Sequence, residues 1–344
     1  MLFLIKGLTS IELARGFLHA IRFLEAVTLY YIVVYFIRAK KLKISTLLKL
    51  LIITTIFQAL LGPLQSIFNN FGVQEYANNR GYFGYLGLGP TMVYSGRGTF
   101  WHFAAYGYYI GTIFLFLLPF YRNIIKNKFV FNLVLICLFA GILFSYSRGA
   151  LAALIIGVVY YLVVVEHKKT RLMLKLLLIG MIITPFALYF LSNQEYLLSL
   201  NPRNQLWGFH ITYLLQNPGE LIWGAGFESR ESTFYIYAPK YLRHPGDFNP
   251  HNLLLTYLEE IGIVGCLIYL SFWIKVFIDS FKKIKNNSKF MRTFNIGIQL
   301  VLVNVFLSGI NDHVYHDPYL TMFLIFLLGI SYAKTNRSGE KHPI

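Results

Sequence analysis

The sequence predicts an all-α integral membrane protein with about nine or ten transmembrane helices. Two observations carry this prediction. Hydrophobic residues make up 56% of the 344-residue chain. They gather in blocks of about 17–25 residues, the length that a helix needs to cross about 30 Å of hydrocarbon. Charged residues make up only 13%, well below their usual share in soluble domains. We therefore interpret residues 1–344 as a single membrane domain.

The apolar blocks place the predicted spans in order along the chain. They lie at residues 18–37, 47–67, 101–121, 129–146, 150–165, 172–192, 259–278, 294–310 and 318–333. The segment before the first block, Met1–Phe17, is short and contains charged residues, so we interpret it as an interfacial helix or a shortened span.

The connections between these spans alternate in charge. Every second connection is rich in Lys and Arg, and cytoplasmic loops are the ones that collect these residues. The remaining connections are therefore expected to face outward. Two of them are long: a first outward loop at 69–100 and a large outward loop at 193–258, between spans six and seven. The large loop contains an amphipathic stretch, Asn204–Leu215, that predicts a short helix.

The net charge of +16 would suggest nucleic-acid binding in a soluble protein. Here the basic residues have a simpler explanation, because they orient the chain in the bilayer, and we expect no nucleic-acid partner. The chain has two cysteines, Cys137 and Cys266, and both lie inside apolar blocks. Neither a disulfide framework nor a thiolate metal site is therefore indicated.

The predicted outward face is rich in arginine, whereas the cytoplasmic loops use mostly lysine. The outward arginines are Arg80, Arg97, Arg148, Arg203, Arg230 and Arg243. A charge for orientation needs only lysine, but a guanidinium binds phosphate through two parallel hydrogen bonds. The alternative is that each arginine pairs with a nearby acid, which we favour for Arg230 between Glu228 and Glu231 and also for Arg243. Arg148 has no acid near it in the sequence, which favours an anionic ligand.

His251 stands at the outer mouth of the seventh span, in the sequence Asn249-Pro250-His251-Asn252. An imidazole can accept or orient a proton near neutral pH, although a single histidine at a membrane interface is more often structural. The segment Asp312–Asp317 contains further ligand-type residues, but their spacing does not dictate a metal geometry. We therefore assign no metal site.

Four stretches taken together resemble the O-antigen ligase/polymerase superfamily of lipid-linked glycan transferases. They are SGRGTFWHFAAYGYYI, FSYSRGALAALIIG, NPRNQLWGFHITYLLQNPGELIWGAGFES and PHNLLLTYLEEIGIVGCLIYL. The resemblance covers roughly residues 95–280, and each stretch alone is a weak signal. Their order, and their shared position on the predicted outward side, make the combination more specific.

The resemblance implies a membrane glycosyltransferase with a GT-C-like fold, working without metal or cofactor at the outer face of the bacterial cytoplasmic membrane. The donor would be a glycan on undecaprenyl diphosphate, and the acceptor a sugar hydroxyl. By this resemblance Arg148 and Arg203 bind the diphosphate, and His251 contacts or deprotonates the acceptor. The further residues that it implies in substrate binding are Arg97, Arg80, Trp207 and Asn252.

The same motifs leave a choice between two transferases, a polymerase and a ligase, and two other classes of protein remain as alternatives. A polymerase that joins repeat units, assisted by a chain-length regulator, and a ligase that moves glycan to lipid A-core or another acceptor share these motifs. We favour the polymerase because no appended soluble domain for a protein acceptor is present. A transporter or flippase of lipid-linked sugars would be expected to show inverted repeats and interrupted polar helices. A non-catalytic scaffold would leave the outward arginines unexplained.

Overall fold

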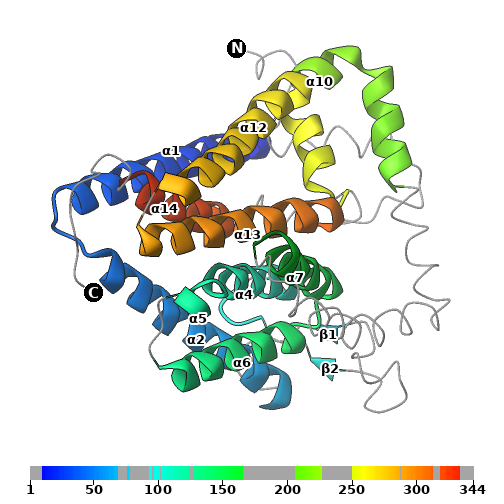
Figure 1. Ribbon diagram of the computed structural model, residues 1–344. Helices are drawn as coiled ribbons and strands as arrows, with labels where there is room; N and C mark the ends of the chain where they lie inside the picture. The colour runs from blue at the N-terminus through cyan, green and yellow to red at the C-terminus, as the bar shows by residue number, and fades with distance from the viewer. Residues whose placement is uncertain are drawn as a thin grey trace. The chain divides into compact units, whose positions relative to one another are not determined.

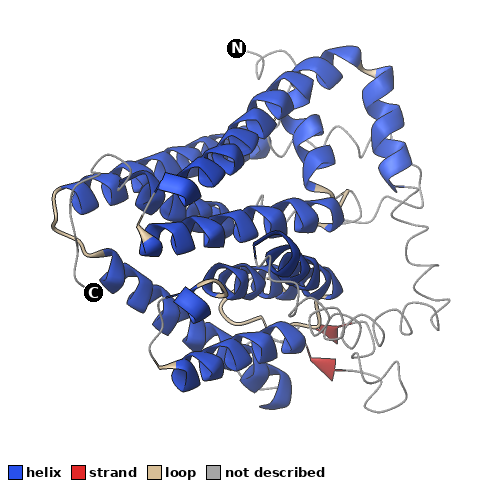
Figure 2. Ribbon diagram, in the orientation of Figure 1, coloured by secondary structure: helices blue, strands red, loops and turns tan. Residues whose placement is uncertain are grey.

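A computed structural model gives the structure of the chain (Figure 1). The residues that it describes are 10–68, 76–77, 93–94, 97–100, 102–123, 127–165, 206–226, 250–286, 288–312 and 318–333. Within them the fold is helical, apart from one antiparallel pair of two-residue strands, β1 (Tyr76–Ala77) and β2 (Val93–Tyr94) (Figure 2). The prediction of a helical fold is confirmed.

The helices follow the predicted apolar blocks. They are α1 (Ser10–Arg38), α2 (Ile44–Phe68), α4 (Phe103–Leu117), α5 (Phe120–Asn123), α6 (Lys128–Phe144), α7 (Arg148–Tyr160), the π-helix η2 (Tyr161–Val165), a helix at 206–216, α10 (Pro218–Trp223), α12 (Leu253–Asn286), α13 (Lys289–Asn311) and α14 (Pro318–Ala333). Each predicted span overlaps a helix except 172–192, which lies outside the described residues. A helix at 206–216 lies where the sequence predicted one at Asn204–Leu215, and the outward position of this loop stays a prediction.

Three of the described helices are long and apolar enough to cross a membrane, namely Ile44–Ile67, Leu253–Lys285 and Lys289–Ile310. The shorter apolar helices are Phe103–Leu117, Lys128–Phe144, Arg148–Val163 and Leu320–Ala333. These features are those of a helical membrane protein. The number of spans and the GT-C-like arrangement stay predictions.

The chain divides into two compact units. One unit contains residues 1–32, 195–276 and 309–326, and the other contains residues 33–194, 277–308 and 327–344. Four helices, α1, α12, α13 and α14, contribute residues to both units. His251 belongs to the first unit, and Arg148 and Arg97 belong to the second.

In the second unit α4 lies between α13 and α6 (Figure 1). The buried ring of Tyr106 on α4 fits against Gly62 of α2 and Gly141 of α6, where a Cβ would lie within 3 Å of its hydroxyl oxygen. Small residues let membrane helices approach closely, so these two glycines explain how α2, α4 and α6 pack. The Tyr106 hydroxyl donates a hydrogen bond to Gln58 O at 3.2 Å.

The helix α13 is the most buried of the three long apolar helices. Its most apolar window is 78% buried, against 22% for α2, so most of the α2 surface is left for lipid. The buried face of α13 also carries polar residues that bond to its neighbours. Asn304 Nδ2 donates to Thr112 Oγ1 of α4 at 2.9 Å, and Ser331 Oγ of α14 donates to Asn295 Oδ1 at 2.8 Å. Such bonds stabilise helix association where no water competes.

In the first unit α12 is broken at Gly262, which has φ 66° and ψ −177°. Leu254 O lies 4.0 Å from Cys266 Sγ, and the rings of Tyr257 and Tyr269 lie 4.5 Å apart. Residues 12 apart in a straight helix would be separated by about 18 Å. The two segments, 253–261 and 263–286, therefore pack against each other, and the first begins inside the predicted loop 193–258.

Candidate functional site

His251 lies in the turn that precedes α12. Its φ of 47° is a left-handed conformation that residues other than glycine rarely adopt. Two contacts hold the turn: Trp207 Nε1 donates to Pro250 O at 2.5 Å, and Asn252 Nδ2 donates to Ile310 O at 3.2 Å. Strained backbone persists where its surroundings fix it, and it gathers at functional sites. The backbone of His251 is therefore held by its neighbours on both sides.

Asn252 caps the first segment of α12. Its Oδ1 accepts a hydrogen bond from Leu255 N at 3.0 Å, the usual role of an asparagine at this position. Both polar atoms of its side chain therefore have a structural partner, as does the indole nitrogen of Trp207. Substrate binding by Asn252 and Trp207 stays a prediction.

The imidazole of His251 faces a carboxylate. Its Nδ1 lies 3.6 Å from Asp312 Oδ1, at the end of α13, and the His251 side chain is 39% exposed. Such contacts are often long in ligand-free structures and tighten when substrate binds. A carboxylate beside Nδ1 favours the tautomer protonated there, which leaves Nε2 to accept a proton. Sequence reasoning placed Asp312 only in the cluster 312–317, of which 313–317 lie outside the described residues.

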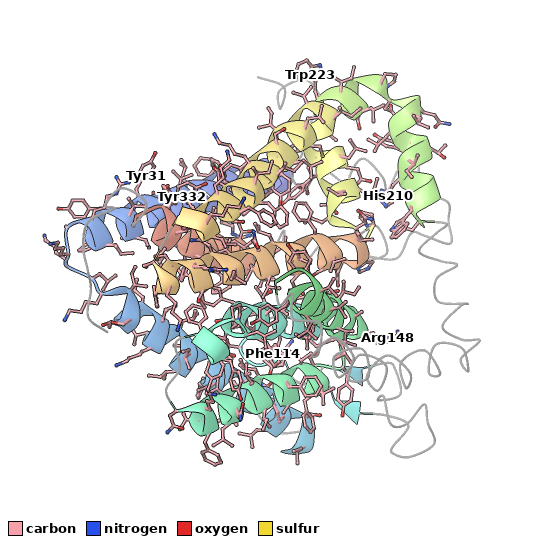
Figure 3. The ribbon with its side chains drawn as sticks, in the orientation of Figure 1. Tyr31, Phe114, Arg148, His210, Trp223 and Tyr332 are labelled. Atoms are coloured by element: carbon pink, nitrogen blue, oxygen red, sulfur yellow. The ribbon has the colours of Figure 1, made fainter. Side chains whose placement is uncertain are left out.

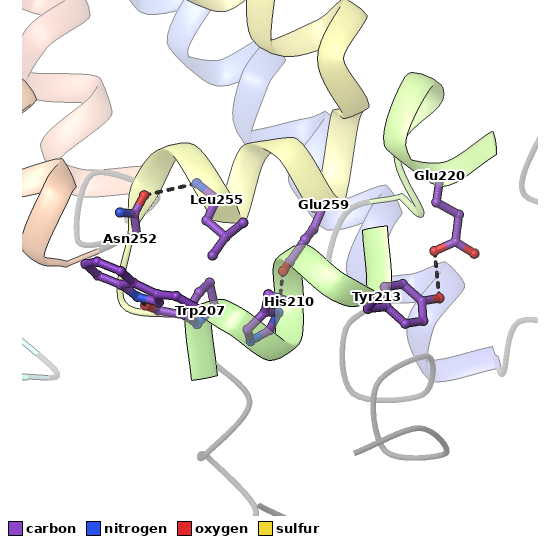
Figure 4. A network of polar contacts seen from close by, with 8 residues as sticks. Trp207, His210, Tyr213, Glu220, Asn252, Leu255 and Glu259 are labelled. Atoms are coloured by element: carbon purple, nitrogen blue, oxygen red, sulfur yellow. Dashed lines mark hydrogen bonds and ion pairs between the residues drawn. The ribbon is translucent and has the colours of Figure 1, made fainter. Parts of the chain in front are cut away.

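The helix 206–216 packs against the first segment of α12. Tyr213 and Leu214 form a small buried cluster with Leu255, and Trp207 and Leu258 pack at its edge. Figure 4 shows Trp207, Tyr213 and Leu255 on the two helices. The apolar contacts fix the position of the helix that carries Trp207 relative to the turn of His251.

A buried contact between a histidine and a carboxyl group lies beside this cluster. His210 Nδ1 contacts Glu259 Oε1, and the two side chains are 0% and 1% exposed (Figure 4). A buried carboxylate is costly without such a partner. Sequence reasoning missed His210, although it lies three residues after Trp207 and therefore on the same helix face. The pair joins the helix 206–216 to α12 at a second point.

The segment Gly224-Ala225-Gly226 lies against the backbone of α12 beside its break at Gly262. Ala225 N donates to Glu259 O at 2.7 Å, and Gly226 N donates to Glu260 O at 3.0 Å. A Cβ on Gly224 would lie 2.3 Å from Glu260 O, and a Cβ on Gly262 would lie 2.3 Å from Ile222 O. Both glycines also have positive φ values, 81° and 66°. The two sequence elements that carry most of the resemblance are therefore in direct backbone contact.

In the second unit, Arg148 is the first residue of α7 (Figure 3). Ser147 caps this helix, since its Oγ accepts a hydrogen bond from Ala150 N at 3.3 Å. Ser145 Oγ accepts from Ser147 N at 3.2 Å, and Tyr146 between them has a φ of 53°. These contacts fix the start of α7. Arg148 therefore adds its charge to the positive end of a helix dipole, an arrangement that favours an anion.

Gly149 beside Arg148 has no room for a side chain. A Cβ there would lie 2.1 Å from the hydroxyl oxygen of Tyr108, which is buried on α4. We expect Gly149→Ala to lower the free energy of unfolding by about 1–3 kcal/mol, the usual cost of overpacking. Tyr108→Phe removes the obstructing oxygen, so the double variant should recover much of the loss.

Thermal unfolding of the purified variants in detergent checks this expectation. Gly111→Ala in α4 is the matched control, because its Cβ would meet nothing closer than 4.0 Å. Equal destabilisation by Gly149→Ala with and without Tyr108→Phe would contradict the account.

Arg97 lies at the same end of the second unit as Arg148. A Cβ on Gly98 would lie 3.0 Å from the ring of Tyr106 near the start of α4, and a Cβ on Gly107 would lie 3.1 Å from Ser147 Cβ before α7. The structure thus brings two of the predicted arginines to one end of α4. Arg203 and Arg80 lie outside the described residues.

A comparison with known protein families bears on the resemblance found in the sequence. Residues 133–270 match the family model described as O-antigen ligase. This match confirms the resemblance: residues 133–270 are similar to the O-antigen ligase family, a family of glycan-transferring enzymes. The match contains Arg148, Arg203, Trp207, His251 and Asn252, whereas Arg80 and Arg97 precede it. No curated protein matches the chain.

Proposed function

We propose that this protein transfers a glycan from undecaprenyl diphosphate to the hydroxyl of an acceptor sugar. The reaction would take place at the outer face of the bacterial cytoplasmic membrane. The single observation that carries the proposal is the pair formed by His251 and Asp312, with Nδ1 and Oδ1 3.6 Å apart. It supplies an oriented base, and His251 lies within the segment that matches the O-antigen ligase family. That family implies lipid-linked glycans and their acceptors as substrates.

The proposed step balances without an added reactant. The acceptor hydroxyl gives its proton to Nε2 of His251 and forms a bond to the anomeric carbon of the donor glycan. The bond between that carbon and the diphosphate oxygen breaks, and undecaprenyl diphosphate leaves with the electron pair. The imidazolium then returns its proton to water. Asp312 stabilises the imidazolium, as a carboxylate does beside other catalytic histidines.

The arginines act on the donor. A diphosphate leaving group gains negative charge as its bond to the sugar breaks, and fixed guanidinium groups stabilise that charge. Arg148 is held at the start of α7, and Arg97 lies at the same end of α4. We assign donor binding to these two residues and to Arg203, with Arg80 as a further contact.

Within this reaction we favour a polymerase over a ligase. A polymerase uses the lipid-linked glycan both as donor and as acceptor, and it would work with a chain-length regulator. A ligase needs a different acceptor, such as lipid A-core. The chemistry at the acceptor hydroxyl is the same, so the choice of acceptor distinguishes the two.

Purified protein in lipid nanodiscs, incubated with the lipid-linked repeat unit alone, tests the proposal. A polymerase yields a ladder of products that differ by one repeat unit. No ladder, but a single transfer once lipid A-core is added, would establish a ligase instead. Absence of transfer under both conditions would overturn the proposed function.

A further inference from the structure

Two glutamines of α2 bind the backbone of the segment that contains Arg97. Gln65 Oε1 accepts hydrogen bonds from Arg97 N at 3.0 Å and from Gly98 N at 2.8 Å, and Gln65 Nε2 donates to Gly98 O at 2.8 Å. Seven residues earlier in α2, Gln58 Oε1 accepts a hydrogen bond from Thr99 N at 3.0 Å, and Gln58 Nε2 donates to Thr99 Oγ1 at 2.8 Å. Five hydrogen bonds therefore join α2 to three consecutive residues.

The spacing of the two glutamines explains how both reach the same segment. Residues seven apart are separated by about two helical turns, so Gln58 and Gln65 lie on one face of α2. Gln65 is 8% exposed in a helix long and apolar enough to span the membrane. A buried amide in such a helix is costly unless its donor and acceptor are both used, as they are here.

The segment itself is shaped for this contact. Gly98 has a φ of 57°, and a Cβ on it would lie 2.5 Å from Gln58 Oε1. The ring of Phe100 lies 4.9 Å from that of Tyr109 and 6.3 Å from that of Tyr106, so the segment is also anchored to α4. The backbone of Arg97 is therefore fixed from two helices.

A fixed backbone matters for an arginine that must meet a diphosphate. Donors held in place before the charge develops stabilise it without the cost of ordering a loop during binding. Arg97 is half-buried and its Nε atom is shielded from solvent. The Arg97 side chain thus extends from a backbone that is fixed in place.

We propose that Gln65 and Gln58 are positioning residues that hold Arg97 for the anionic diphosphate of the lipid-linked donor. This inference rests on the proposed function. It adds two residues of α2 that lie outside every motif of the resemblance and outside the family match at 133–270. The two glutamines act through Arg97 and need not touch substrate themselves.

A double-mutant cycle tests this inference on the full-length protein in nanodiscs. The readouts are the affinity for undecaprenyl diphosphate and, separately, the donor KM and kcat of transfer. Gln65→Leu should weaken undecaprenyl diphosphate binding and raise the donor KM by about tenfold, the effect of one lost charge-assisted contact. The acceptor KM should stay unchanged. Arg97→Ala should have an effect at least as large.

The decisive value is the coupling between the two substitutions. Residues that act through one another are not additive, so Gln65→Leu should change neither affinity nor donor KM further in the Arg97→Ala background. If Gln65→Leu folds poorly, Gln58→Leu and Gly98→Ala take its place, since each disturbs the same contact. Both should weaken the binding of undecaprenyl diphosphate in the same way. Thr54→Ala is the control on α2, because its exposed hydroxyl bonds only to Leu50 O and Leu51 O of its own helix.

Additive effects of Gln65→Leu and Arg97→Ala would overturn the inference, because the glutamine would then act independently of the arginine. Unchanged undecaprenyl diphosphate affinity in either single variant would overturn it too. Failure of the proposed function is distinguishable: wild-type protein would then bind undecaprenyl diphosphate without transferring glycan, and the binding cycle would still report on Gln65.

Discussion

Replacing His251 by alanine is expected to reduce glycan transfer by about 10²–10⁴-fold, the usual contribution of a general base. The physical reason is the arrangement of Nδ1 against Asp312, which prepares the imidazole to accept the acceptor proton. Affinity for the lipid-linked donor should stay close to wild type, because the guanidinium contacts to the diphosphate do not need the imidazole. Turnover and donor binding of the purified variant are the measurements.

Two further variants separate chemistry from folding. Asp312→Asn should lower kcat in the same direction while leaving donor affinity intact, since the carboxylate lies beside the imidazole and orients it. Asn252→Ala removes the helix cap and the bond to Ile310 O, so it reports the cost of loosening the turn itself. Near wild-type turnover per folded molecule in His251→Ala would remove His251 from the mechanism.

Replacing Arg148 by alanine should reduce transfer by about 10²–10³-fold, the range found when one preorganised donor to a developing negative charge is removed. Unlike the His251 variant, this protein should also bind undecaprenyl diphosphate more weakly. The contrast follows from the two positions: Arg148 starts α7 beside its Ser147 cap, whereas His251 faces the carboxylate of Asp312.

Parallel assays of donor binding and turnover on purified Arg148→Ala check this expectation. Arg38→Ala at the end of α1 is the charge control, because Arg38 is exposed and follows the first predicted span on the cytoplasmic side. Unchanged donor affinity in Arg148→Ala would assign this arginine to the packing of α7.

The helices were predictable because the bilayer imposes a length on apolar blocks. The blocks at 47–67, 129–146 and 294–310 match α2, α6 and α13 closely, because each of these apolar blocks forms one helix without an interior break. The start of α7 was also marked in the sequence, because Ser147-Arg148-Gly149 combines a cap, a charge and a residue without a side chain. Local signals sufficed for these elements.

The break in α12 was not predictable from the same signals. A glycine inside an apolar block, such as Gly262, is commonly tolerated in a continuous helix. Its positive φ follows from the close approach of Ile222 O and Gly224 N, which belong to a segment some forty residues earlier. The predicted span at 259–278 therefore missed that 253–261 is a separate segment, which the turn of His251 precedes.

The polar pairs of the candidate site were missed for a related reason. His210 and Glu259 come together only because the helix 206–216 packs on α12, and Asp312 reaches His251 only through the end of α13. Sequence periodicity identifies the face of one helix, but not the helix that will cover it. The prediction that Arg148, Arg203 and His251 serve one substrate stays a prediction.

The most direct test of the account is the stoichiometry of the reaction with purified protein in nanodiscs, lipid-linked donor, acceptor and EDTA. The account predicts one undecaprenyl diphosphate released for each glycosidic bond formed, an undiminished rate in EDTA, and loss of both products in His251→Ala. Donor recovered intact while the wild-type protein moves it across the bilayer would contradict it. So would release of undecaprenyl diphosphate without a new glycosidic bond.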